Sequence, residues 1–268
     1  MNAYIIKFLD YVTETKVWKS FRSKKKLFGL YKKIMGNRIG NYVMSDRIMD
    51  VQNNGMSVIS EITKSLEACN VKFFVDNGTL LGLKRNNKLI SWDYDVDFGI
   101  FITDRFTWQQ LEEQMAKIGF TKDHQFKFKG KITEQTYKRE DMFIDFFNHL
   151  NCDENTSFYC FYKDDNVKYS KANELSVMEL KTKKITGTQK LELSEGCYVY
   201  VPIEAEEYLA DLYGKTWRIP NPQNRERIYI VGFDRERFNL PKDYQFAFPV
   251  PPKTPTRLGD ILEKNGDI

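Results

Sequence analysis

Cysteine and histidine, the residues that build zinc sites and disulfide scaffolds, are scarce in this sequence. Its 268 residues include four cysteines and two histidines, and no two cysteines follow the Cys-x₂-Cys spacing of zinc ligands. We therefore expect no structural zinc site, and reduced cysteines as in a protein of a reducing compartment. Long apolar runs are also missing, since none approaches the ~20 residues of a membrane-spanning helix, and no signal-peptide core follows Met1. Any membrane anchor is expected outside this sequence.

An excess of charge of one sign is missing from most of the chain. Lys and Arg number 41 and Asp and Glu 37, but residues 16–33 alone hold eight basic residues and no acidic one. The remainder therefore has 33 basic against 37 acidic residues. Because nucleic-acid-binding domains carry basic patches along their binding faces, we predict no nucleic-acid partner.

The basic stretch 16–33 also carries aromatic residues at helical spacing. A helix with aromatics on one side and lysines on the other suits the surface of an anionic membrane, which predicts peripheral membrane contact. The alternative is a solvated helix whose aromatics dock on the rest of the protein. The aromatic residues are Trp18, Phe21, Phe28 and Tyr31.

Glycines, prolines and apolar spacing divide the chain into three regions. We predict a basic amphipathic helical segment in residues 1–50, a folded domain in 51–240 and an extended proline-rich tail in 241–268. Within the first region, a helix to residue 35 is followed by a connector over 36–50.

Apolar periodicity places helices and strands within the domain. Helices are predicted over 51–69 with Ile59, Ile62 and Leu66 inward, from a cap at Thr103 or Asp104 to Ile118, and from Pro202 to Leu212. Strands are predicted at 71–75, 95–102, 142–147, 158–162 and 197–201, with a hairpin over 120–131.

The most informative stretch of the chain runs from Val71 to Ile102. Its pattern is a strand, a glycine turn, a short helix, a loop and a second strand, with Asp93, Asp95 and Asp97 where that second strand begins. Side chains two apart on a strand share a face, so Asp95 and Asp97 point one way and the apolar residues between them the other. Carboxylates held together repel each other unless a cation neutralises them, and hard oxygen ligands suit Mg²⁺ or Mn²⁺.

Other residues can complete such a site. Asp145 lies inside the apolar strand 142–147, where an unpaired carboxylate is costly, so it should have a metal or another partner; a salt-bridged or edge-strand aspartate is the alternative. Gly78 and Thr79 form a turn that opens a helix, whose backbone N–H groups can hold a phosphate. Lys84 and Arg85 follow and could contact phosphate oxygens.

Two other metal-binding patterns contain aspartates at this spacing, and each fits the sequence less well. A calcium-binding EF-hand loop needs Gly at its sixth position and Glu at its twelfth, but these places hold Phe98 and Asp104. The Asp-x-Asp element of metal-dependent sugar transferases fits Asp95 and Asp97, although the glycine turn and Asp145 argue against it.

The stretch Asp76–Asp97 resembles the signature of the LicD/fukutin family within the nucleotidyltransferase-fold superfamily. The sequence of Trp92–Asp97 is especially similar to that of fukutin-related protein, although the zinc-binding cysteines expected in that protein have no counterpart in this chain. Lys88 stands where the family often has Gly, and Asn148-His149 where it often has Pro. The matching residues are Gly78-Thr79-Leu80-Leu81-Gly82, Arg85, Ile90, Trp92, Asp93, Asp95 and Asp97, then Phe143–Phe147, and finally Val201-Pro202, Tyr208-Leu209, Tyr213-Gly214, Trp217 and Pro220.

The resemblance implies an α+β fold, a nucleotidyltransferase-like mixed β-sheet flanked by helices, as the catalytic domain. It implies a metal-dependent phosphotransferase that moves a phosphorylated small alcohol (phosphocholine, ribitol phosphate or glycerol phosphate) from a CDP-linked donor to a glycan hydroxyl and releases CMP. The acceptor would be a capsule, lipopolysaccharide, teichoic acid or glycoprotein glycan. The expected location is the cytoplasm at the inner face of the membrane, or the secretory-pathway lumen in a eukaryote.

The same resemblance assigns roles to residues. Asp95 and Asp97 bind Mg²⁺ or Mn²⁺, and Asp145 completes the metal cluster or takes the acceptor proton. Asp93 is a third ligand or supports the ligands. For the donor, phosphate is expected at Gly78 and Thr79, with Lys84 nearby and Arg85 stabilising the leaving phosphate. Trp92 either packs beneath its loop or stacks on substrate, and His149 is predicted to be structural.

The sequence leaves open two alternatives to a phosphotransferase. A true nucleotidyltransferase would use the same metal ligands but leave the nucleotide on its acceptor. A catalytically silent family member would only bind a glycan, although a binding module has no need to retain the aspartate set.

Overall fold

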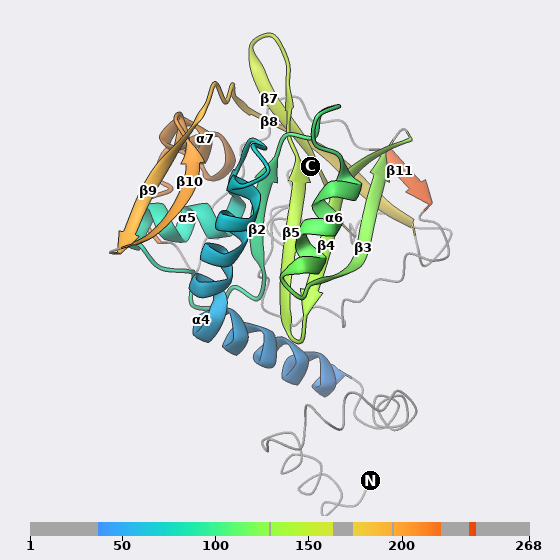
Figure 1. The fold of residues 1–268 in the computed structure, drawn as a ribbon, viewed down its shortest axis with the longest axis vertical. Coiled ribbons are helices and arrows are strands. Elements are labelled where there is room, and N and C mark those ends of the chain that lie inside the picture. Colours follow the sequence, from blue (N-terminus) through green and yellow to red (C-terminus); the bar gives the residue numbers. More distant parts are fainter. Residues whose placement is uncertain (1–36, 129, 163–173, 195, 221–235, 240–268) are drawn as a thin grey trace, which may run out of the picture. The chain divides into compact units, whose positions relative to one another are not determined.

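A computed structural model describes residues 37–128, 130–162, 174–194, 196–220 and 236–239 (Figure 1). The chain divides into two units, Met1–Asp46 with Phe248–Thr254 and Arg47–Ala247 with Pro255–Ile268, and the second unit contains all the strands described below. The predicted helix over 1–35, the membrane contact through 16–33 and the extended tail over 241–268 lie outside the described residues.

Helices and strands alternate from α4 to β3, and the strands β3 to β10 then follow one another before α7. The helices are α4 (Asn37–Glu67), α5 (Asn77–Asn86), α6 (Trp108–Lys117) and α7 (Ala205–Tyr213). The strands are β1 (Phe73–Val75), β2 (Val96–Ile100), β3 (Thr121–Phe128), β4 (Lys131–Arg139), β5 (Met142–Asn148), β6 (Leu150–Asn151), β7 (Asn155–Tyr162), β8 (Glu174–Lys183), β9 (Thr188–Ser194), β10 (Cys197–Pro202) and β11 (Glu236–Asn239).

A five-stranded sheet with the order β1-β2-β5-β4-β3 forms the centre of the domain. Strands β2 and β5 are parallel, whereas the other neighbours in this sheet are antiparallel. A second sheet has the order β11-β8-β7-β6, and β9 and β10 form a hairpin. The predicted α+β fold with a mixed sheet is confirmed.

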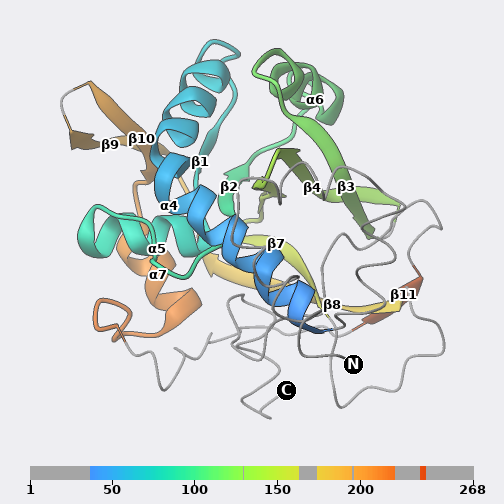
Figure 2. The same ribbon diagram turned by 90° about the horizontal axis from the view of Figure 1, so that it is seen from below.

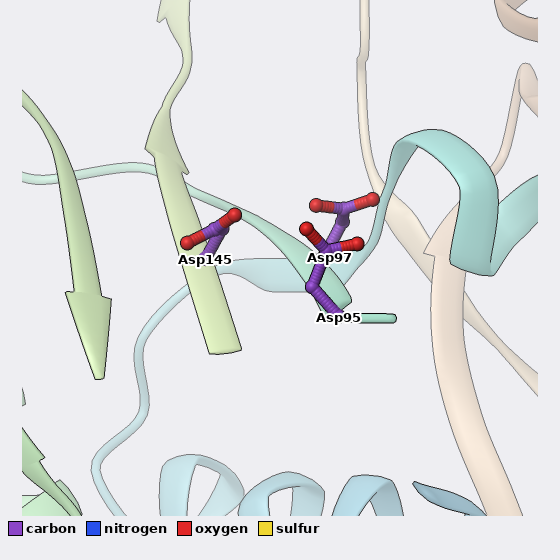
Figure 3. A group of neighbouring side chains, drawn as sticks. All are labelled: Asp95, Asp97 and Asp145. Carbon is purple, nitrogen blue, oxygen red and sulfur yellow. The ribbon is translucent and has the colours of Figure 1, made fainter. Parts of the chain in front are cut away.

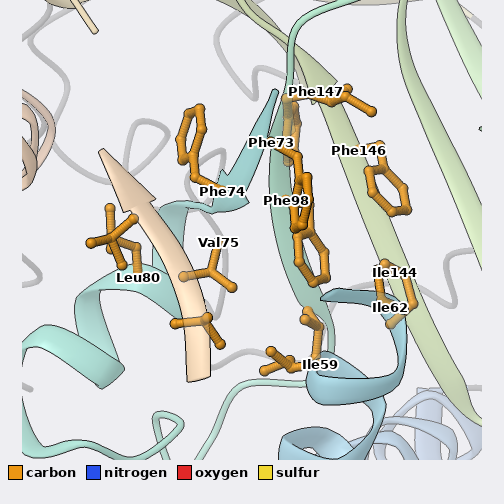
Figure 4. Close-up of a cluster of buried hydrophobic side chains, with 14 of the residues drawn as sticks. Ile59, Ile62, Phe73, Phe74, Val75, Leu80, Phe98, Ile144, Phe146 and Phe147 are labelled. Carbon is orange, nitrogen blue, oxygen red and sulfur yellow. The ribbon is translucent and has the colours of Figure 1, made fainter. Parts of the chain in front are cut away.

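The part of α4 that belongs to the second unit, from Arg47 onward, covers one face of the central sheet together with α6, and β7 and β8 lie on the other side (Figures 1 and 2). Ile59 and Ile62 of α4 pack toward the strands, as predicted (Figure 4). The rings of Phe98 and Phe146, on the parallel strands, stack with centroids 5.3 Å apart. The core therefore fixes the two strands on the face opposite the aspartates.

Three predicted boundaries are wrong. The connector over 36–50 is helical from Asn37 onward, because α4 runs unbroken to Glu67 and Gly40 is tolerated inside it. Helix α6 is capped by Thr107, not Thr103 or Asp104, because Thr107 and Gln110 form a reciprocal capping box. Pro202 ends β10 instead of starting α7, which begins at Ala205.

The remaining elements match the predictions in part. The strands at 71–75, 142–147, 158–162 and 197–201 are present. The hairpin predicted over 120–131 is longer, because β3 pairs with β4, which runs to Arg139. Strands β6, β8, β9 and β11 were not predicted. All four cysteines are free. None of the helices that the structure describes combines the length and the apolar character needed to cross a membrane.

Candidate metal centre

Three aspartates meet where the pairing of the parallel strands β2 and β5 begins. Asp97 of β2 lies directly opposite Asp145 of β5 in the strand register, and Asp95 precedes β2 on the same face. One carboxylate oxygen of each residue lies within 4.8 Å of the other two, and all three residues are buried. Figure 3 shows Asp145 reaching from the neighbouring strand toward the pair. The structure thus brings together the three residues predicted as metal ligands.

The donor set of this cluster fits a hard divalent cation. Carboxylate oxygens are the ligands that Mg²⁺, Mn²⁺ and Ca²⁺ prefer, and no sulfur or imidazole belongs to the group. Opposite oxygens around an octahedral Mg²⁺ lie about 4.2 Å apart, so small side-chain rotations close the group onto one ion. Three buried carboxylates with no cation would repel one another strongly.

The first turn of α5 contacts the start of β2. The backbone N–H of Asp97 donates to Thr79 Oγ1 over 3.0 Å, and the N–H of Asp76 donates to the carbonyl of Asp97 over 2.9 Å. The N-terminus of α5 therefore lies beside the carboxylate cluster, where its dipole favours negative charge. Thr79 is fixed by the Asp97 backbone, and its predicted role at the donor phosphate stays a prediction.

Two glycines of α5, one turn apart, make room for the chain that returns from the helix. A Cβ at Gly78 would lie 2.5 Å from Oδ2 of Asp93, and a Cβ at Gly82 would lie 2.5 Å from the carbonyl oxygen of Lys88. Close packing of this loop thus explains both glycines. It also places Asp93 against α5, outside the group formed by Asp95, Asp97 and Asp145.

Asp76, immediately before α5, accepts hydrogen bonds from three elements although no motif singles it out. Its carboxylate accepts from the N–H of Asn77 (2.7 Å) and from Tyr208 Oη (2.5 Å), and it lies 2.7 Å from His149 Nε2. Asp76, His149 and Tyr208 are fully or almost fully buried. Burial, and then the charge of Asp76, raises the pKa of Tyr208 well above its usual value, so its hydroxyl remains a donor.

His149 is held in this buried network as one tautomer. A carboxylate only accepts, so Nε2 carries the hydrogen toward Asp76, while Nδ1 is buried and has no hydrogen-bond partner among the described residues. The ring packs against Phe74 and Phe158, with centroids 4.9 and 4.4 Å away. These contacts agree with the predicted structural role of His149.

The predicted donor-binding cations lie at the other end of α5. Lys84 Nζ is 3.2 Å from a carboxylate oxygen of Glu206 in α7, and Arg85 donates from Nε to the carbonyl of Trp217. Both contacts join α5 to α7 and to the loop after it. The assignment of Lys84 and Arg85 to donor phosphate stays a prediction, and the structure adds this joining role.

Arg47 and Trp92 have surroundings that bear on substrate binding. The guanidinium carbon of Arg47 lies 3.5 Å from the ring centroid of Phe143, which shares a face of β5 with Asp145, so it brings positive charge to that face. Arg47 is buried, and its place in an ordinary amphipathic helix gave no signal. Trp92 is 46% exposed, which disfavours packing beneath the loop and leaves its face open to a substrate.

A second group of charges lies beyond Asp145, on β3 and β4. Asp123 contacts Nδ1 of His124 (3.0 Å) and Nζ of Lys138. Burial raises the pKa of the Asp123 carboxyl, but hydrogen bonds from His124 and Lys138 and their charges outweigh it, giving a pKa of about 2 against the usual 3.8. Asp123 is therefore ionised in the folded protein throughout the neutral range.

Asp123→Asn is expected to weaken the acid dependence of stability. The folded-state pKa of Asp123 is lower than its unfolded value, so the carboxylate stabilises the fold above about pH 4 and this contribution is lost as the pH falls toward 2. The free energy of unfolding should therefore drop less between about pH 5 and about pH 3 in the variant than in wild type, as measured by urea titration. Equal drops in the two proteins would contradict the depressed pKa.

Residues 70–202 match the family model described as LicD/FKTN/FKRP, nucleotidyltransferase domain. The matched segment begins just before β1 and ends with β10, so it contains the carboxylate cluster and Asp76.

Among the curated relatives, a longer match to this chain goes with a lower identity. The chain is 33% identical over 90 residues to human ribitol 5-phosphate transferase FKRP, covering 33% of this chain and 17% of that protein. It is 27% identical over 175 residues to ribitol-5-phosphate transferase FKTN of Macaca fascicularis, covering 64% of this chain and 35% of that protein. A stretch of 46 residues is 61% identical to the type II methyltransferase M.SsoII of Shigella sonnei, covering 17% of this chain and 12% of that protein.

These relatives are much longer than the stretches they share with this chain. The chain spans 12% of the methyltransferase and 17–35% of the two ribitol-phosphate transferases. A stretch of 46 residues is smaller than a typical independent domain, so the methyltransferase match carries no activity to this chain.

Proposed function

Residues 70–202 belong to the LicD/FKTN/FKRP nucleotidyltransferase family, and on that premise we propose that the protein is a metal-dependent phosphotransferase. It moves a phosphorylated small alcohol, of the ribitol phosphate, glycerol phosphate or phosphocholine type, from a CDP-linked donor to a glycan hydroxyl, and CMP leaves. Two curated relatives are named as ribitol-phosphate transferases, which supports transfer of a phospho-alditol.

One observation carries the proposal: Asp95, Asp97 and Asp145 form a single buried group inside the family-matched segment. Their oxygens fit Mg²⁺ or Mn²⁺, which when bound would neutralise the diphosphate of the donor and polarise the phosphorus under attack. A buried group of this kind inside a nucleotidyltransferase-family segment favours a transferase over a purely glycan-binding protein.

The reaction forms one bond and breaks one. The acceptor oxygen attacks the phosphorus that bears the alcohol, the bond from that phosphorus to the CMP oxygen breaks, and the hydroxyl proton passes to a carboxylate. Asp145, at the edge of the group, and Asp93, beside the start of α5, are the candidate proton acceptors. The N-terminus of α5, beside the carboxylates, would favour phosphate oxygens, and Arg47 brings positive charge to the face of β5 that carries Asp145.

The mass of the product tests the proposal. The purified protein is incubated with Mg²⁺, a glycan acceptor and, in parallel, CDP-ribitol, CDP-glycerol or CDP-choline. We expect one donor to release CMP and the glycan to gain the phospho-alcohol, with no product after chelation of the metal. A glycan that gains CMP would identify a nucleotidyltransferase instead, and no turnover with any donor would favour a silent glycan-binding protein.

A further inference from the structure

Asp145 is hydrogen-bonded on the side away from the other two aspartates. Thr136 of β4 lies directly opposite Asp145 of β5 in the antiparallel register, and its hydroxyl donates to Asp145 Oδ1 over 2.5 Å. Thr136 and Asp145 are each 1% exposed, so solvent does not compete for this bond. The hydroxyl has a single hydrogen, so the bond to Asp145 fixes its direction.

The same hydroxyl contacts a histidine on the next strand. His124 of β3 lies opposite Thr136 in the register, with Nε2 3.2 Å from Thr136 Oγ1. The other ring nitrogen, Nδ1, lies 3.0 Å from the carboxylate of Asp123, which only accepts and therefore holds the ring with a hydrogen on Nδ1. Phe126 packs against the ring, with centroids 5.0 Å apart.

These contacts form one line across three adjacent strands. It runs from Asp123 and His124 on β3, through Thr136 on β4, to Asp145 on β5. Strand pairing sets the spacing of each step, because His124, Thr136 and Asp145 occupy matching register positions. Stability alone does not require such a line, since apolar side chains could fill these buried positions without needing partners.

We propose that Thr136 and His124 are positioning residues for the metal site, which hold the Asp145 carboxylate in the orientation that coordinates the ion. This inference rests on the proposed metal-dependent function. Asp145 is the one ligand of the group that comes from a different strand, so its orientation decides whether the three oxygens converge. Partners that orient a ligand in this way typically contribute 10–100-fold to metal affinity.

The test compares two substitutions at Thr136 that differ in the hydroxyl. Thr136→Val keeps the shape and removes the hydroxyl, whereas Thr136→Ser keeps it. With Mn²⁺ alone as the probe, isothermal titration calorimetry should show binding about 10–100-fold weaker in T136V and close to wild type in T136S. Equal affinities in T136V and T136S would overturn the inference.

A second variant keeps the test decisive if T136V does not fold. His124→Leu removes the contact to Thr136 and leaves the hydroxyl in place, so it should weaken Mn²⁺ binding in the same direction as T136V. Unchanged affinity in H124L would overturn the role of His124. If wild type itself binds no Mn²⁺, the metal site fails and the inference with it, an outcome distinct from binding that ignores the substitutions.

Discussion

Asp97→Asn is expected to abolish phosphotransfer, lowering turnover by about 10³-fold or more, while the protein stays folded. An amide keeps the shape of the side chain but loses the charge that a divalent ion needs at this position. The fold should survive because the substitution leaves unchanged the backbone of Asp97, which is hydrogen-bonded to Thr79 of α5 and to Asp76, the residue between β1 and α5. Product formation with the active CDP-linked donor measures the loss, and circular dichroism checks the fold.

An exposed aspartate nearby provides the matched control. Asp104 lies on the surface between β2 and α6, so Asp104→Asn makes the same chemical change outside the site. It should turn over like wild type. Substantial turnover by D97N, with Mn²⁺ affinity intact, would show that the cluster does not hold the catalytic ion.

Asp76→Ala is expected to cost about 3–5 kcal/mol of the free energy of unfolding, the largest stability effect we predict. The change removes the acceptor shared by Asn77, His149 and Tyr208. The Tyr208 hydroxyl and the His149 N–H would then be buried with no acceptor, each at a cost of about 1–3 kcal/mol. Domains have only about 5–15 kcal/mol in total, so the variant should unfold at much lower denaturant.

Urea unfolding of three proteins tests this expectation. Asp76→Asn keeps one acceptor oxygen and should lose less stability than Asp76→Ala. Asp104→Ala, at an exposed position, should unfold within about 0.5 kcal/mol of wild type. A loss below about 1 kcal/mol in D76A would contradict the role of this carboxylate as a shared acceptor.

The sequence predicted the part of the site that local patterns encode. Alternation along β2 placed Asp95 and Asp97 on one face, and the charge of Asp145 within an apolar strand marked it as a partner. The structure brings these three residues together. Helical periodicity predicted a buried stripe of α4 at Ile59, Ile62 and Leu66, and the burial of all three residues confirms it.

The sequence could not predict contacts made by distant residues that carry no local signal. Asp76 precedes a helix, as many capping residues do, and only the fold brings His149 and Tyr208 to it. Thr136 and His124 are ordinary strand residues until the register sets them beside Asp145. Gly78 was assigned to phosphate, although the close approach of Asp93 is enough to require a glycine there.

The parallel pairing of β2 with β5 also dictates when the site can exist during folding. Asp97 and Asp145 are 48 positions apart (145 minus 97), and α6, β3 and β4 must be accommodated between them before their strands meet. Contacts of such sequence separation form late, because the chain entropy of closing the loop opposes them until other structure is in place. An ion therefore binds the finished sheet and cannot nucleate it, so added metal should slow unfolding and leave the folding rate unchanged.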